Sequence, residues 1–178
     1  RPWFGDAAET GFPYLRRRGP AAIINLRSGW PTPPLLSGGR LGEAQLRRFA
    51  TMLQACGEEG LVRIVLLHHP IAEGAASPRQ ALFDAAALRA TLKEHGAELV
   101  LHGHVHFPEP AAIPGPEGAI PVLGVSSASA RSHGNPQARW HGIEIEGAGP
   151  AARLQLMVRG FEADGDRIVE LDRRPLKP

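Results

Sequence analysis

Cysteine is almost absent from this chain, because Cys56 is the only one among 178 residues. A single thiol excludes an internal disulfide and a cysteine-based zinc cage, which leaves histidine and carboxylate as the candidate metal ligands. Long apolar runs are missing too, since no segment approaches the roughly 20 residues of a membrane-spanning helix. The opening residues RPWFGDAAET lack the pattern of a signal peptide. We therefore expect a cytoplasmic protein without a membrane segment.

A large excess of charge of one sign is also lacking, because the formal net charge is only +2. Such a balance gives no indication of a nucleic-acid partner. Hydrophobic residues make up 43% of the chain and charged residues 21%, which is the composition of a folded globular protein rather than a disordered one. The length is that of one domain, and we expect residues 1–178 to form a single domain.

Three short apolar runs rich in β-branched residues predict buried strands, at residues 21–28, 61–70 and 97–104. Their hydrophobicity is nearly uninterrupted, which is typical of strands that are covered on both faces of a parallel sheet. The segments between them have the lengths of helical crossovers. The order strand, helix, strand, helix, strand favours parallel neighbours.

Two helices are predicted between these strands. Residues 42–57 place Leu46, Phe49, Met52 and Leu53 on one helical face, with Arg47 and Arg48 turned outward. Residues 84–96 form the second helix, where Asp84 is expected to cap the beginning and Gly96 to end it.

Beyond residue 115 the pattern changes to short strands with more polar alternation. The segments lie at residues 119–127, 139–147, 152–162 and 166–172, and ADGD at 163–166 predicts a hairpin turn. We expect these strands to form an antiparallel sheet packed beside the parallel part. The predicted class is therefore α/β, with mixed parallel and antiparallel strands.

Histidines end two of the predicted parallel strands. His68 and His69 end the run LVRIVLLHHP, and His102, His104 and His106 follow in LVLHGHVHFP. One right-handed crossover brings the carboxyl ends of neighbouring parallel strands together, and ligands bind at that rim in open α/β sheets. Neutral imidazole is a common ligand of transition metals. Any one of these histidines alone is better explained without a metal, but the joint pattern favours a metal site. His95, His133 and His141 are interpreted as structural.

These motifs carry a resemblance to a known family. LLHHP followed by LHGHVH resembles the last two motifs of the calcineurin-like metallophosphoesterases, an isolated histidine at a strand end and then Gly-His-x-His. The segment at residues 12–46 is similar to the middle of bacterial members. The resemblance implies a two-sheet sandwich flanked by helices, and hydrolysis of small phosphate mono- or diesters by a hydroxide that two metals activate.

The resemblance also implies a ligand set. His68 and His104 would bind the second metal and His106 the first, with His69 and His102 as outer neighbours, although the choice between His68 and His69 stays open. The cofactors would be two divalent transition metals, manganese, iron or zinc.

The family's Asp-x-His, Gly-Asp and Gly-Asn-His-Asp/Glu motifs have no counterpart here, and we interpret Asp6, in a Gly-Asp pair, as a surface residue. The chain is therefore expected to be the C-terminal part of a catalytic domain, with an open sheet edge beside residues 21–27. Without a bridging carboxylate, two cations would repel each other uncompensated, so this chain would hold one metal or none. The alternatives are a non-catalytic fragment or pseudoenzyme that binds at most one metal through His68, His104 and His106, and an unrelated mononuclear hydrolase that uses Glu73.

Overall fold

Six strands form the larger of two sheets, in the order β1-β2-β3-β4-β6-β5. The computed structural model describes residues 11–106, 110–127, 137–162 and 167–176. The six strands are β1 (Tyr14–Arg18), β2 (Ala21–Asn25), β3 (Val62–Leu66), β4 (Leu99–His102), β5 (Pro110–Gly115) and β6 (Gly118–Gly124). Strands β2, β3, β4 and β6 run parallel, and β1 and β5 pair antiparallel at the two edges.

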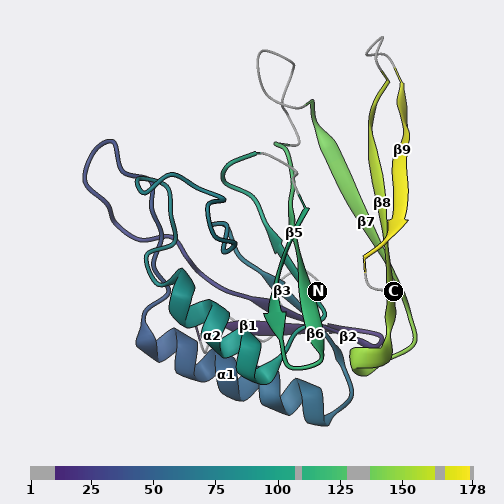
Figure 1. The fold of residues 1–178 in the computed structure, drawn as a ribbon, viewed down its shortest axis with the longest axis horizontal. Helices are drawn as coiled ribbons and strands as arrows, with labels where there is room; N and C mark the ends of the chain where they lie inside the picture. Colours follow the sequence, from purple (N-terminus) through teal and green to yellow (C-terminus); the bar gives the residue numbers. More distant parts are fainter. Residues whose placement is uncertain (1–10, 107–109, 128–136, 163–166, 177–178) are drawn as a thin grey trace.

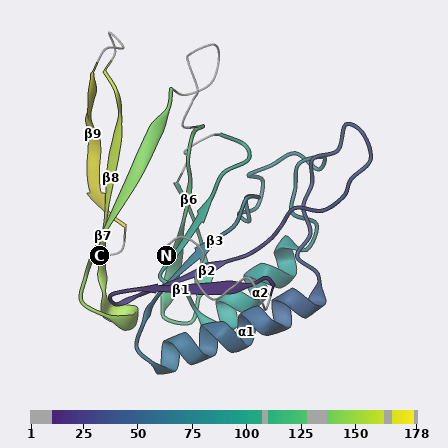
Figure 2. The ribbon, with the colours of Figure 1, turned by 180° about the vertical axis from the view of Figure 1, so that it is seen from behind.

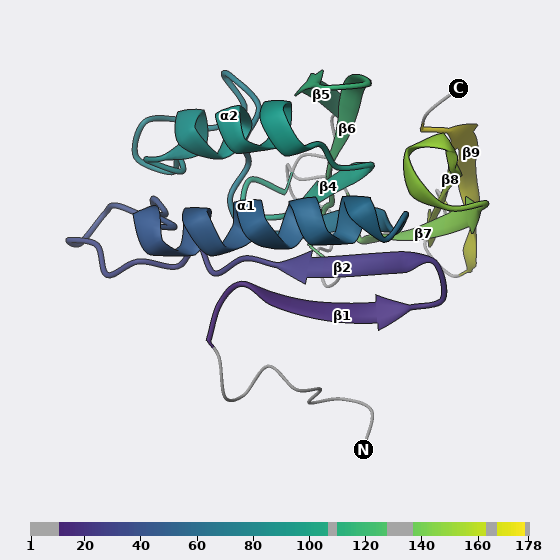
Figure 3. The same cartoon turned by 90° about the horizontal axis from the view of Figure 1, so that it is seen from below.

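Two helices, α1 (Glu43–Glu58) and α2 (Ala85–His95), cover one face of this sheet, as Figures 1 and 3 show. Helix α1 buries Phe49 and Leu53 against the strands and leaves Arg47 and Arg48 exposed, as its sequence pattern predicts. Leu88 and Leu92 of α2 join the same core. No helix of the described residues is long and apolar enough to cross a membrane.

The second sheet covers the opposite face. It consists of β7 (Arg139–Glu146), β8 (Arg153–Phe161) and β9 (Ile168–Pro175), all antiparallel, with a short 3-10 helix, η1 (Gly149–Ala151), between β7 and β8. Leu154, Leu156 and Val158 of β8 alternate toward the larger sheet and pack there against Val62 and Leu99. Figure 2 shows this sheet standing beside the larger one. The helices, the larger sheet and the smaller sheet therefore form three layers with a core on each side of the larger sheet.

The predicted parallel core is confirmed, and two sheet assignments need correction. The strand predicted at residues 119–127 does not join the antiparallel sheet, because β6 pairs parallel with β4 in the larger sheet. The edge beside residues 21–27 is not open either, because β1 pairs with β2 over its whole length. A single strand's pattern shows which of its faces is buried but not which strand lies next to it, so pairing could not be read locally.

Asp84 occupies the predicted position before α2 but does not cap that helix. No side-chain capping bond forms there, and the carboxylate instead accepts hydrogen bonds from the backbone N–H groups of Leu41 and Gly42 at 2.8–3.1 Å. Gly42 is the residue that precedes α1. One carboxylate therefore joins the beginnings of both helices.

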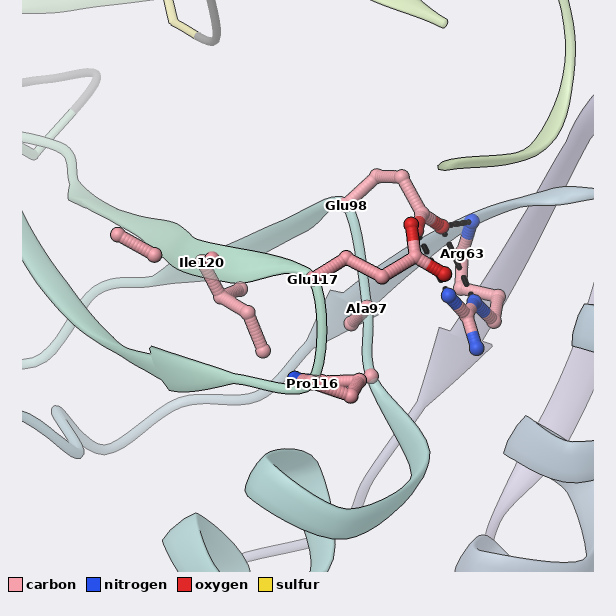
Figure 4. Close-up of a pocket in the computed structure, with 9 residues that line it drawn as sticks. Arg63, Ala97, Glu98, Pro116, Glu117 and Ile120 are labelled. Atoms are coloured by element: carbon pink, nitrogen blue, oxygen red, sulfur yellow. Dashed lines mark hydrogen bonds and ion pairs between the residues drawn. The ribbon is translucent and has the colours of Figure 1, made fainter. Parts of the chain in front are cut away.

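A buried ion pair joins β3 to the start of β4 at the end opposite to the histidines (Figure 4). Both Arg63 and Glu98 are almost completely buried. The Glu98 carboxylate accepts hydrogen bonds from the Arg63 backbone N–H, Nε and a terminal guanidinium nitrogen, at 2.6, 3.1 and 2.7 Å. The other terminal nitrogen donates to the carbonyl of His95 at 2.6 Å. Every polar group of the pair thus has a partner, which is the condition under which buried charges are tolerated.

Candidate functional site

The carboxyl ends of β3 and β4 lie side by side and hold the candidate site. Leu66 pairs with Leu101 in the parallel register, and beyond the strands the N–H of Gly103 donates to the carbonyl of His68 at 3.1 Å. The two histidine motifs therefore meet, although 36 residues separate His68 from His104. The ring centroids of His68, His69 and His104 lie 4.4–5.0 Å from one another.

His68 and His104 make the closest contact of the site. Nε2 of His68 and Nδ1 of His104 are 3.0 Å apart, so one ring donates a hydrogen bond to the other. The remaining ring nitrogen of His104, Nε2, is buried and has no hydrogen-bond partner among the described residues. An unpaired buried polar atom is costly and points to an interaction that the described residues do not supply.

The backbone around His104 is held in an uncommon conformation. His104 and His106 have positive φ angles of 69° and 58°, in the left-handed region that residues other than glycine rarely adopt. The N–H of Val105 bonds to the carbonyl of Gly103 at 2.9 Å and tightens the turn. Such conformations cluster at functional sites, where the surrounding structure maintains them.

The site favours neutral imidazole rings. Burial lowers the pKa of His104, and positive charge on His69, His68 and His106 lowers it further, while the backbone of Gln80 acts in the opposite direction. Burial also lowers the pKa of His68, together with positive charge on His69 and His106. At neutral pH these rings therefore keep a nitrogen lone pair that can bind a cation.

His69 and His102 support the site from behind. His69 is 3% exposed, and both of its ring nitrogens are engaged, Nδ1 with the hydroxyl of Ser28 at 2.8 Å and Nε2 with the carbonyl of Ser37 at 3.0 Å. The carbonyl can only accept, so Nε2 of His69 carries a proton, and Nδ1 shares its hydrogen bond with the Ser28 hydroxyl. Nδ1 of the buried His102 bonds to the carbonyl of Gly103 at 3.1 Å. The outer roles of both histidines beside a metal stay predictions.

The loop partners of His69 were not predicted from the sequence. Gly39 approaches the ring so closely that an added β-carbon would stand 2.4 Å from Nδ1 of His69. Glycine at this position is the one local signal of such an approach, and it lies in a Pro- and Gly-rich segment that reads as an ordinary surface turn.

The residues present fit an imidazole site for one cation but not a bridged pair of metals. His106 is exposed and lies near enough to affect the pKa values of His68 and His104, yet the three do not converge. Among the described residues, no group of three or more His, Cys, Asp or Glu side chains is arranged to hold a metal ion. The ligand roles of His68, His104 and His106 stay predictions.

The other sequence candidates lie elsewhere or outside the described residues. The carboxylate of Glu73 is exposed and pairs with Arg89 of α2 at 3.1 Å, which gives the mononuclear alternative no support. His95 ends α2, as predicted. Asp6 and His133 fall outside the described residues.

Comparison with known proteins gives likeness at the level of the fold. No family model and no curated protein sequence matches the chain. A dimetal phosphatase from Danio rerio is similar over 75% of this chain and 38% of its own, with a TM-score of 0.52 and 15% sequence identity. A single mutant of Vps29 from Entamoeba histolytica is matched over 87% of this chain and 99% of that chain, with a TM-score of 0.36 and 14% identity. The chain thus spans well under half of the phosphatase, and the shared part confirms the predicted metallophosphoesterase-like α/β fold.

Proposed function

We propose that this chain supplies the histidine part of the metal site of a phosphoesterase that hydrolyses small phosphate mono- or diesters. The observation that carries the proposal is the buried, unpartnered Nε2 of His104 beside His68, at the carboxyl rim of the parallel strands. A dimetal phosphatase shares the fold in which this rim occurs. Ligand sites of open α/β sheets lie at this rim.

Each histidine has a distinct task in this proposal. His68 and His104 are neutral at neutral pH and would bind one cation, and His106 would turn toward a neighbouring one. His69 and His102 hold the ring positions through their own hydrogen bonds. A bound manganese, iron or zinc ion supplies Lewis-acid polarisation of a phosphoryl oxygen and a hydroxide at neutral pH. The neutral rings bring no negative charge to the site, so any bridging carboxylate must come from residues beyond this cluster.

The test compares His104→Ala and His106→Ala with His95→Ala, a histidine in the last turn of α2. Mn²⁺ binding is measured by titration calorimetry, and hydrolysis is followed with bis(p-nitrophenyl) phosphate. We expect the two rim variants to lose at least about tenfold in Mn²⁺ affinity, as is typical when a metal site is disturbed, and the control to bind normally. Unchanged Mn²⁺ affinity in His104→Ala would contradict the proposal.

A second function is a non-catalytic protein that binds at most one metal through the same histidines. It is favoured by the lack, among the described residues, of any group of three or more metal-ligating side chains. Metal binding without hydrolysis by the chain would support it. Hydrolysis with two bound ions per chain would contradict it.

A further inference from the structure

A pocket of about 400 Å³ lies between the two sheets, at their edge near the histidines. It is lined by Leu101, His102, Leu123, Val125, Ser126, Arg139, Trp140 and His141. Figure 1 shows β6, which contributes Leu123, and β7, which contributes Arg139, Trp140 and His141, facing each other from the larger and the smaller sheet. Volumes of about 300–1,000 Å³ are usual for sites that bind small molecules.

The pocket opens on the same face of the larger sheet as His68. Leu66 and Leu101 are paired neighbours that both pack toward the smaller sheet, whereas Leu67 packs toward the helices. His68 follows by alternation on the side of Leu66, and an added β-carbon on Gly103 would lie 4.0 Å from its Nδ1. Leu101 and His102 of β4 both line the pocket, and the N–H of the next residue, Gly103, donates to the carbonyl of His68 at 3.1 Å. The pocket and the histidine site are therefore neighbours on one rim.

The wall from the larger sheet is mostly apolar, and the wall from β7 carries the guanidinium of Arg139 and the imidazole of His141 beside Trp140. Ile143 and Ile145 of β7 pack into the core between the sheets, so alternation turns Arg139 and His141 to that side as well. Neither Arg139 nor His141 makes a side-chain hydrogen bond or ion pair within the part of the chain that the structure describes. Guanidinium and imidazole groups pack well on the face of an aromatic ring, and an unpaired arginine attracts an anion.

We propose that this pocket binds the aromatic organic group of the phosphate ester whose phosphate lies at His68 and His104. The proposal rests on the proposed function and narrows its substrate to esters of aromatic alcohols. Leu101, Leu123 and Val125 exclude water from one face of the ring. Arg139 draws the anionic ester to the opening between the pocket and the histidines.

The test measures the affinity of the 178-residue chain for phenyl phosphate, methyl phosphate and phenol by titration calorimetry with Mn²⁺ present. Val125→Trp fills the pocket, and Ala112→Trp places the same side chain in a separate groove beside β5 as a matched control. We expect phenyl phosphate to bind at least about tenfold more tightly than methyl phosphate, because binding in the pocket buries the apolar surface of the phenyl ring. Val125→Trp should abolish this preference without changing methyl phosphate affinity, and Ala112→Trp should preserve it.

Equal affinities for the two esters, or a preference that Val125→Trp leaves intact, would overturn the pocket assignment and leave the phosphoesterase proposal standing. If His104→Ala leaves methyl phosphate affinity unchanged while Val125→Trp still abolishes phenol binding, the aromatic pocket stands and the phosphoesterase fails. Circular dichroism checks that Val125→Trp folds. Arg139→Met provides a second variant, which should weaken phenyl phosphate binding at least about fivefold and leave phenol binding unchanged, since one charged contact is lost.

Discussion

Glu98→Ala should destabilise the protein more than any exposed ion-pair substitution. The change removes three hydrogen bonds from Arg63, at 2.6, 2.7 and 3.1 Å. It leaves an arginine side chain that is 7% exposed, with the His95 carbonyl as the one remaining hydrogen-bond partner among the described residues. Removing one partner of a buried pair costs about 3–5 kcal/mol because the other charge stays buried. Domains are stable by about 5–15 kcal/mol in total, so the loss is a large share of the free energy of unfolding.

The free energy of unfolding is measured by urea denaturation with far-ultraviolet circular dichroism. Glu59→Ala is the matched control, since Glu59 pairs with Arg17 at 2.6 Å while both side chains are about half exposed. Exposed pairs contribute about 0–1 kcal/mol, so this variant should be close to the parent. A loss below about 1 kcal/mol in Glu98→Ala would refute the buried-charge reasoning. The double variant Arg63→Met with Glu98→Leu should recover most of the loss, because no charge is then left unpaired.

Two further predictions concern the rim. Burial lowers the pKa of His102 in the folded chain, so below the ordinary value of about 6.5 the unfolded chain binds more protons and stability decreases as the pH is lowered. Urea denaturation from about pH 8 to about pH 5 should show this decrease. His102→Gln should make the decrease smaller without removing it, because the pKa values of His68, His104 and His141 are lowered as well. Gly39→Ala should cost about 1–3 kcal/mol, because its β-carbon would overlap the His69 ring, whereas Gly29→Ala, with open space around it, should be neutral. Equal unfolding free energies for these two alanine variants would contradict the close approach at Gly39.

The sequence predicted the interior of the larger sheet well and its edges poorly. Strands β2, β3 and β4 are nearly continuous apolar runs, and such runs have few other ways to be buried. Strand β1 contains three consecutive arginines, Arg16, Arg17 and Arg18, which have the appearance of a solvated loop rather than an edge strand. Strand β6 was predicted as a strand but assigned to the wrong sheet, because its partner β4 is set by long-range packing.

In the candidate site too, features set by the local sequence could be predicted, and contacts between distant segments could not. That His68 and His104 meet follows from two parallel strands that end in histidine, which is a local pattern combined with one topological rule. The hydrogen bonds of Ser28 and Ser37 to His69 come from a loop about 30–40 residues away in the sequence, and no sequence pattern predicts them. The positive φ angles of His104 and His106 likewise could not be predicted, because residues other than glycine rarely adopt them.

The adjacent histidines at the end of β3 make the site sensitive to strand register. Because β3 is apolar on both faces, hydrophobicity alone does not distinguish it from a copy shifted by one residue. Such a shift would exchange the positions of His68 and His69. The His68 ring would then lie beneath the loop that contains Ser28 and Ser37, and the His69 ring would be exposed. Polar contacts at the two ends of β3, Arg63 with Glu98 and His69 with Ser28, exclude the shifted pairing. A one-residue insertion or deletion within β3 would therefore change which histidine faces the site, although every histidine would remain in the sequence.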